Sequence, residues 1–109
     1  MIIEQMSISV SRGKRQELGE VFSSLVGPIQ VQPGCLYCRL FQTWPGRDRL
    51  QMEARWESEE ALMGHLQSHI YKKLLLLMEL SSAPPGLEFF TVLEFRGLDL
   101  VETARRSQD

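Results

Sequence analysis

The amino-acid sequence predicts an α+β sandwich in which four antiparallel strands carry two helices on one face. Three observations support this fold class. Four short segments rich in bulky apolar residues read as strands, the first with clear apolar and polar alternation. Two longer segments repeat their apolar residues every three to four positions, as amphipathic helices do. Along the chain these segments follow the order β-α-β-β-α-β, which is typical of a ferredoxin-like sandwich.

The first half of the chain is expected to contain two strands and one helix. Residues 2–10, "IIEQMSISV", alternate with period two and predict a strand. A helical stripe of apolar residues then runs over 18–29, and Gly27 with Pro28 is expected to disturb its last turn. After the turn signal "QPG", residues 35–44 predict the second strand.

The second half is expected to complete the sheet and add the second helix. "PGRDR" forms a hairpin loop, and residues 50–56 return as the third strand. Ser58 is a suitable N-cap for a single helix that extends to about Leu80. "APPG" ends that helix, and residues 87–97 predict the fourth strand.

Length and composition describe one domain without a nucleic-acid or membrane signal. The chain has 109 residues, of which 43% are hydrophobic and 24% charged, and a net charge of −2. We expect residues 1–96 to form the domain and residues 97–109 a polar C-terminal tail. The charge offers no basic surface for nucleic acid, and the apolar runs are too short for a membrane span. The start "MIIEQMSISV" lacks signal-peptide features, so we expect a cytoplasmic protein with reduced thiols.

The predicted fourth strand is apolar on both of its faces. A sandwich with helices on one side would leave half of these side chains in water. We therefore expect a homodimer whose sheets face each other, giving a dimeric α+β barrel. The side chains expected to contribute are Phe89, Phe95 or their neighbours.

Both histidines of the chain lie in the predicted second helix. His65 and His69 are spaced i, i+4, which would put both imidazoles on one helical face and suits a metal. The zinc-peptidase motif requires a glutamate where the chain has Leu66, and no third ligand is evident. We expect no metal, although a metal-dependent site on this pair stays an alternative to an acid/base or a packing role.

"CLYC" has the spacing of a redox or zinc motif but lies inside a predicted strand. Residues three apart in a strand point to opposite faces, so Cys35 and Cys38 are not expected to share a bond or a metal. We expect two structural cysteines.

A ligand pocket is expected between the second helix and the sheet. His65 would supply a proton acceptor or donor near neutral pH, and the apolar lining suits a flat aromatic ligand. The expected lining residues are Trp56, Met6, Leu36, Cys38, Leu40, Met52, Leu62 and His69. The alternative is structural: His65 bonds a backbone carbonyl and Trp56 is plain core.

Three sequence features together resemble a known family. Gly13 follows the first strand, "PGCL" enters the second, and "WESEEALMGH" leads into the second helix. With the fourth strand the likeness covers residues 1 to about 96. These features resemble the antibiotic biosynthesis monooxygenase (ABM) family of dimeric α+β barrel proteins.

The resemblance implies oxygen insertion into a phenol or quinol without flavin, haem or metal, and hence no cofactor. The substrate supplies the electrons, and the protein supplies a dry pocket and a base. His65 would be the acid/base and Trp56 would shape the pocket, whereas His69 has no fixed family role. Haem-degrading relatives carry a tryptophan at position 65 and a histidine at position 75, so haem degradation is disfavoured.

The chain departs from the family pattern at one position. Many relatives place a glutamate two residues before the tryptophan, where this chain has Ala54. Glu53 is not expected to replace it, because a shift of one residue moves a side chain to the other sheet face. This departure favours the alternative of a non-catalytic small-molecule-binding or sensing protein on the same fold.

Overall fold

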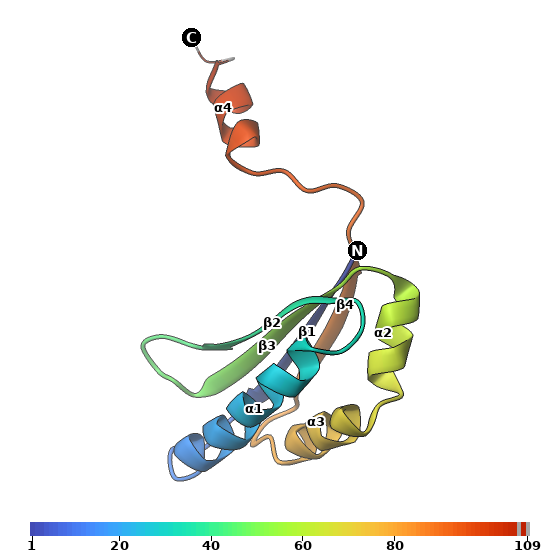
Figure 1. Ribbon diagram of the computed structural model, residues 1–109. Helices are drawn as coiled ribbons and strands as arrows, with labels where there is room; N and C mark the ends of the chain where they lie inside the picture. Colours follow the sequence, from blue (N-terminus) through green and yellow to red (C-terminus); the bar gives the residue numbers. More distant parts are fainter. Residues whose placement is uncertain (107, 109) are drawn as a thin grey trace.

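The computed structural model describes residues 1–106 and residue 108. Its antiparallel sheet has the strand order β2-β3-β1-β4. The strands are β1 (Ile2–Ser9), β2 (Cys35–Gln42), β3 (Arg49–Trp56) and β4 (Gly86–Thr91). One face of the sheet is covered by α1 (Arg15–Gln30), α2 (Glu59–Leu66) and α3 (His69–Glu79) (Figure 1). The predicted α+β ferredoxin-like class is confirmed.

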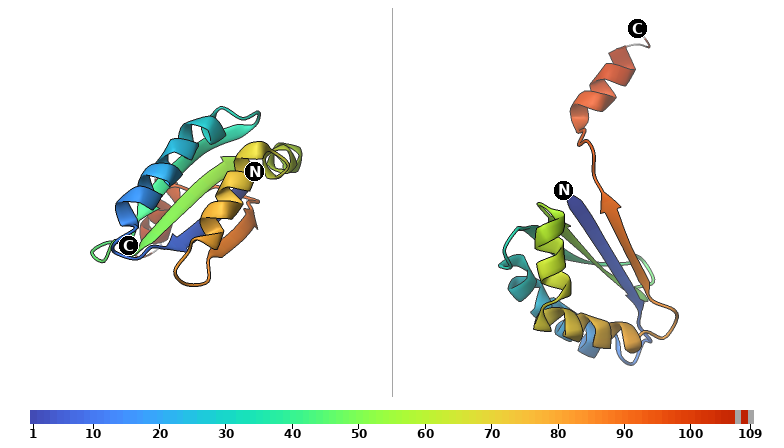
Figure 2. Two further views of the ribbon diagram at one scale, coloured as in Figure 1. Left: turned by 90° about the horizontal axis from the view of Figure 1, so that it is seen from below. Right: turned by 90° about the vertical axis from the view of Figure 1, so that its right-hand side faces the viewer.

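The central strand β1 shows why the core lies on the helix side of the sheet. Its side chains alternate, so that Glu4, Met6 and Ile8 are fully buried beneath the helices. Gln5 and Ser7 lie on the other face, which no helix covers (Figure 2). The apolar members of the buried face form one core with the inward stripe of α1. Glu4 is the one charged side chain that this alternation carries into the core.

The predicted second helix is in fact two helices, which corrects the expectation of one helix from Ser58 to about Leu80. α2 ends at Leu66, and α3 begins at His69 with Ser68 as its N-cap. The Ser68 hydroxyl accepts from the Tyr71 N–H at 3.3 Å and donates to the His65 carbonyl at 2.7 Å. Serine can bond the backbone in this way instead of continuing a helix.

The break also changes which face of the second segment is buried. In α3 the buried side chains are Tyr71, Leu74 and Leu77. A single uninterrupted helix would have directed His69 and Lys73 inward, but both are exposed. For this reason Tyr71, which the continuous helix would not bury, was not expected beside His65.

A β-bulge in β2 corrects two further expectations. Cys35 pairs with Trp56 and Cys38 with Ala54, so Leu36 is an extra residue in the ladder and is 52% exposed. Leu36 therefore does not line the helix-covered face. Cys35 and Cys38, expected on opposite faces, both lie on the helix side.

Strands β2 and β4 are shorter than predicted at their C-terminal ends, and α1 is longer than its predicted apolar stripe. β2 ends at Gln42 and β4 at Thr91. α1 continues through Gly27 and Pro28 to Gln30, because Ile29 is held in the core.

The C-terminal segment, predicted as a polar tail, contains a helix. α4 (Leu98–Arg106) stands away from the sheet, and every one of its residues is exposed (Figures 1 and 2). Residues 107 and 109 of the expected tail lie outside the described residues. Across the described part of the chain, no helix combines the length and the apolar character that crossing a bilayer requires.

Candidate functional site

α2 brings His65 into the core at the end of the sheet. The Ser58 hydroxyl caps the helix by accepting a hydrogen bond from the Ala61 N–H at 3.1 Å. Glu59 and Glu60 lie in the first turn, where their negative charges interact favourably with the helix dipole. This start fixes the face of the helix that points inward. His65 lies on that face and is 1% exposed.

The two ring nitrogens of His65 face different partners. Nδ1 lies 2.7 Å from Oε1 of Gln32, in the loop between α1 and β2. Nε2 lies 3.0 Å from Oε1 of Glu4 on β1. The second contact has ion-pair distance without hydrogen-bond alignment, and Nε2 has no hydrogen-bond partner among the described residues.

Two aromatic residues fix the plane of the imidazole. Trp56 stacks on His65 with ring centroids 4.4 Å apart, and Tyr71 contacts it edge-on at 5.0 Å. The Trp56 indole N–H donates to Glu4 Oε1 at 3.3 Å. One carboxylate oxygen is therefore shared by the indole and the imidazole.

Glu4 is a residue of this candidate site that was not expected from the sequence. It is 0% exposed, and its Oε2 has no hydrogen-bond partner among the described residues. A buried carboxylate is costly unless nearby groups compensate it; here the Trp56 N–H donates to Oε1, and Nε2 of His65 lies 3.0 Å from the same atom. The signal was present in the sequence: position 4 lies in phase with Met6 and Ile8, so a charged residue there had to point inward.

The position of Glu4 bears on the departure from the family pattern at position 54. In the register of β1 and β3, Glu4 lies directly opposite Ala54. A carboxylate is therefore present on β1, opposite the position at which the family resemblance expects one on β3, and it lies 3.0 Å from Nε2 of His65. Glu53, as expected, lies on the open face, where it accepts hydrogen bonds from Tyr37 and Gln5.

Burial and the nearby Glu4 carboxylate raise the pKa of three neighbouring groups. The pKa of Tyr71 is raised to about 12 by burial and then by the Glu4 carboxylate. Burial, with a smaller contribution from Glu4, raises the pKa of Cys35 to about 11. Burial followed by Cys35 and Glu4 raises that of Cys38 to about 12. All three groups are neutral at pH 7, so the two thiols are not activated nucleophiles.

A pocket of about 450 Å³ lies at the surface beside His65. It opens between the α1–β2 loop and α2. Its lining residues are Gln32, Pro33, Gly34, Glu57, Ser58, Glu60, Ala61, Gly64 and His65. This pocket has more polar side chains than the expected one, and Trp56 lies behind the imidazole rather than in its wall.

The other predicted lining residues lie elsewhere. Met6, Cys38 and Met52 are buried in the continuous core, and Leu40 packs against it. Leu62 lines a neighbouring hollow with Phe89. Leu36 and His69 are exposed for the reasons given above, the bulge and the helix break.

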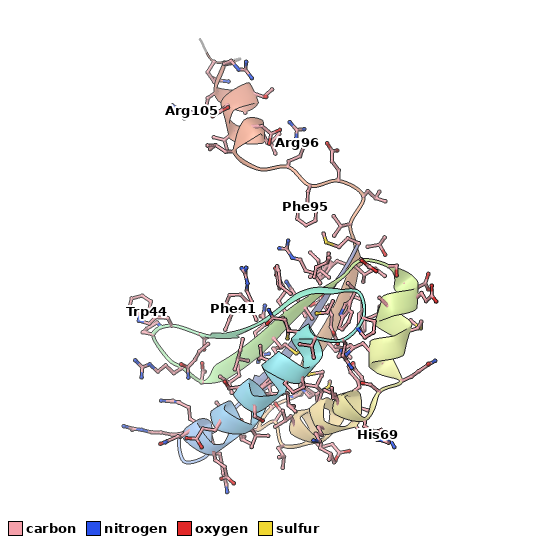
Figure 3. All side chains as sticks on the ribbon, viewed as in Figure 1. Phe41, Trp44, His69, Phe95, Arg96 and Arg105 are labelled. Atoms are coloured by element: carbon pink, nitrogen blue, oxygen red, sulfur yellow. The ribbon has the colours of Figure 1, made fainter. Side chains whose placement is uncertain are left out.

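The i, i+4 histidine pair does not form. His65 belongs to α2 and points inward, whereas His69 begins α3 and lies at the rim of the molecule (Figure 3). Within residues 1–106 and 108, no three His, Cys, Asp or Glu side chains are grouped to hold a metal ion.

Comparison with known proteins assigns the chain to a family. The model of the antibiotic biosynthesis monooxygenase family matches residues 1–75. No curated protein matches the chain in sequence.

Solved structures share the fold at low sequence identity. A Deinococcus radiodurans protein, provisionally named an antibiotic biosynthesis monooxygenase, has a TM-score of 0.79 at 15% identity, covering 89% of this chain and 97% of that one. Rv0793 from Mycobacterium tuberculosis has a TM-score of 0.77 at 18% identity, covering 88% and 98%. A conserved Methanosarcina mazei protein has a TM-score of 0.73 at 23% identity, covering 82% and 89%. The family match covers well over half of the chain, which therefore belongs to the antibiotic biosynthesis monooxygenase family.

Proposed function

We propose that the protein is a cofactor-independent monooxygenase that oxidises a small phenol or quinol with O₂. The observation that carries this proposal is the position of His65, which is held between Gln32 and Glu4 at the inner wall of the pocket. A buried imidazole with a fixed ring plane, reached from a pocket, is suited to general acid–base chemistry.

The reaction balances without an external reductant. A phenol with an unsubstituted para carbon and one O₂ give a para-quinone and one water. The phenol loses four electrons and O₂ gains them, with one oxygen atom entering the ring and the other leaving as water. The substrate is therefore the only electron source that the reaction needs.

His65 would act at two points of this reaction. It first takes the phenolic proton, because the phenolate gives electrons to O₂ more readily than the phenol does. It later returns a proton to the peroxide oxygen that leaves as water. Trp56, stacked behind the ring, would hold the imidazole in one orientation through both transfers.

Oxygen consumption with a panel of phenols and hydroquinones tests this proposal. We expect His65→Ala to lower kcat by about 10²–10⁴-fold, the usual contribution of a positioned acid/base. His69→Ala is the matched control, because it removes the other histidine from an exposed position. The two variants should therefore separate the site histidine from the surface histidine in one assay.

The alternative is a non-catalytic binding protein of the same fold. Its supporting observation is the pocket lining, in which Glu57 and Glu60 are exposed at the surface and offer polar contacts without any evident chemical role. Binding of a quinone without oxygen consumption by any member of the panel would favour this alternative and end the monooxygenase proposal.

We also propose that the protein is a homodimer whose open sheet faces meet. The strand register places Phe41 and Phe90 on that face, where both are exposed. Phe95 lies under the Arg55 guanidinium at 5.0 Å (Figure 3). The centre of the face is polar, with Gln5, Glu53 and Tyr37 linked by hydrogen bonds. The expected interface is therefore apolar at its edges and hydrogen-bonded at its middle. Phe89, expected to contribute, faces the helix side instead, since it pairs with Glu4.

A further inference from the structure

We infer that Glu4 is a positioning residue that keeps a proton on Nε2 of His65 and leaves Nδ1 as the nitrogen that exchanges protons with a substrate. The catalytic part of this inference rests on the proposed function, whereas the choice of nitrogen does not. Glu4 itself does not line the pocket and is fully buried, so it acts through His65.

The partners of the two nitrogens differ in what they can accept and donate. A carboxylate oxygen only accepts hydrogen bonds, and Glu4 Oε1 already accepts the Trp56 N–H. Its neighbour at 3.0 Å, Nε2, is therefore favoured in the protonated form. A bare Nε2 would leave two electron-rich atoms 3.0 Å apart in the core without a proton between them.

Gln32 can be a hydrogen-bond partner of Nδ1 whether or not that nitrogen carries a proton. Its amide oxygen, 2.7 Å away, accepts from Nδ1 when that nitrogen is protonated. After a half-turn of the amide, its NH₂ group donates to Nδ1 when that nitrogen is bare. Only Nδ1 thus has a partner for both protonation states, which an exchanging nitrogen requires.

Access to the site agrees with this assignment. Gln32 and His65 both line the pocket, so a substrate hydroxyl that displaces the Gln32 amide would meet Nδ1. Nε2 lies on the core side, next to fully buried Glu4 and beneath the Trp56 ring.

Apart from Glu4, the titratable groups on the core side of the imidazole are neutral at pH 7, whereas the acidic Glu57 and Glu60 line the pocket at the exposed surface. Tyr71 reaches the ring from α3, and Cys35 with Cys38 lies on β2, within the influence of Glu4. Because their pKa values are raised to about 11 or 12, they do not compete with Glu4 for the proton on Nε2. Gln32 from the α1–β2 loop carries no charge.

The strand register offers a direct test by moving the carboxylate. Position 54 lies opposite position 4, so Glu4→Ala combined with Ala54→Glu keeps one carboxylate beside the same histidine. The ¹⁵N chemical shifts of the His65 ring, measured where the ring is neutral, report which nitrogen carries the proton. Exposed His69 provides a reference in the same spectra.

We expect the wild-type ring to be protonated on Nε2 and bare on Nδ1. Glu4→Ala should give a mixture of the two tautomers, and the double variant should restore the wild-type shifts. Glu4→Gln keeps the side-chain volume and gives the same comparison if Glu4→Ala does not fold. A wild-type proton on Nδ1, or unchanged His65 shifts in Glu4→Ala and Glu4→Gln, would overturn the inference.

Measurements of turnover distinguish a failure of this inference from a failure of the proposed function. In an active enzyme, Glu4→Gln should lower kcat by about tenfold or more and leave KM nearly unchanged, because the substituted group does not touch the pocket. Tautomer changes in a protein that never consumes oxygen would end the monooxygenase proposal but leave the role of Glu4 intact. Full turnover in Glu4→Gln with unaltered ring shifts would end the role of Glu4 alone.

Discussion

Trp56 and His65 stack with their ring centroids 4.4 Å apart and their planes inclined by 25°. The indole also donates to Glu4, the residue that faces the other edge of the imidazole. Trp56 therefore contributes to the orientation of the histidine in two ways, through its ring face and through its N–H group. This double role allows the two contributions to be separated by substitution.

Trp56→Phe should retain a ring beneath the imidazole but lose the hydrogen bond to Glu4. We expect the free energy of unfolding to fall by about 1–3 kcal/mol, because a buried carboxylate loses a donor and a small void is left. Urea denaturation followed by circular dichroism measures this change. Trp44→Phe is the control, since Trp44 is 86% exposed at the hairpin tip and should change stability by less than about 0.5 kcal/mol (Figure 3). Equal effects of the two substitutions would contradict the described core.

Gly34→Ala should both destabilise the protein and narrow the pocket. Gly34 has φ +77°, and a Cβ there would lie 2.4 Å from Cβ of Ala61. We expect a loss of about 2 kcal/mol or more, because strain and steric overlap add. Gly19→Ala, within α1 with open space around it, should instead stabilise by about 0.5–1 kcal/mol. We expect the denaturation midpoint of Gly34→Ala to lie below that of the wild type and that of Gly19→Ala to lie above it.

The two thiols should react slowly in the native protein. With the pKa of Cys35 at about 11 instead of 9.0, the thiolate fraction at pH 8 is about 100-fold below that of an ordinary thiol. Cys38, at about 12, should react more slowly still. Iodoacetamide labelling at pH 8, in buffer and in urea, measures the difference by mass spectrometry. Rapid labelling of native Cys38 would show that this thiol is not buried.

The same raised pKa values predict lower stability in alkali. Below pH 9 the thiols of Cys35 and Cys38 are protonated in both states, so their contribution to stability is complete. Above pH 9 the unfolded thiols ionise first, and the contribution is lost as pH rises through about 11 to 12. Tyr71, whose pKa rises from 10.0 to about 12, acts in the same direction. Urea midpoints between pH 8 and 10.5 should fall, and Tyr71→Phe should reduce the slope.

Phe90→Asp should weaken the proposed dimer. Phe90 pairs with Ile3 in the register of β1 and β4, which places it on the open face. Light scattering at micromolar concentration should show dimers for wild type and monomers for this variant. Leu76→Asp, at an exposed position of α3 on the helix layer, is the matched control and should remain dimeric. A monomeric wild-type protein would contradict the proposed assembly.

Hydrophobic periodicity was sufficient to predict the strands, the helix layer and their order. It worked because each segment buries one face, so that the spacing of apolar residues reports the direction of the side chains. It failed where a polar residue or an extra residue changed the phase. Ser68 interrupts a helix whose apolar spacing continues, and Leu36 adds one residue to a strand whose alternation looks regular.

The sequence predicted only part of the site. His65 and Trp56 were recognised by their residue types and by their place in a family pattern. Glu4 and Gln32 were not, because their roles arise from contacts across 61 and 33 positions of the chain. Only the register of β1 with β3 and the course of the α1–β2 loop bring these side chains to the imidazole.

Neighbouring antiparallel strands can each bring a carboxylate to the same place in a core, because residues that pair across the strands point to the same face. A column-by-column comparison of chains would count position 54 as a lost acid, whereas a comparison by location finds the acid one strand away. Relatives with a small residue at that column should therefore be checked on the adjoining strand before they are classed as inactive.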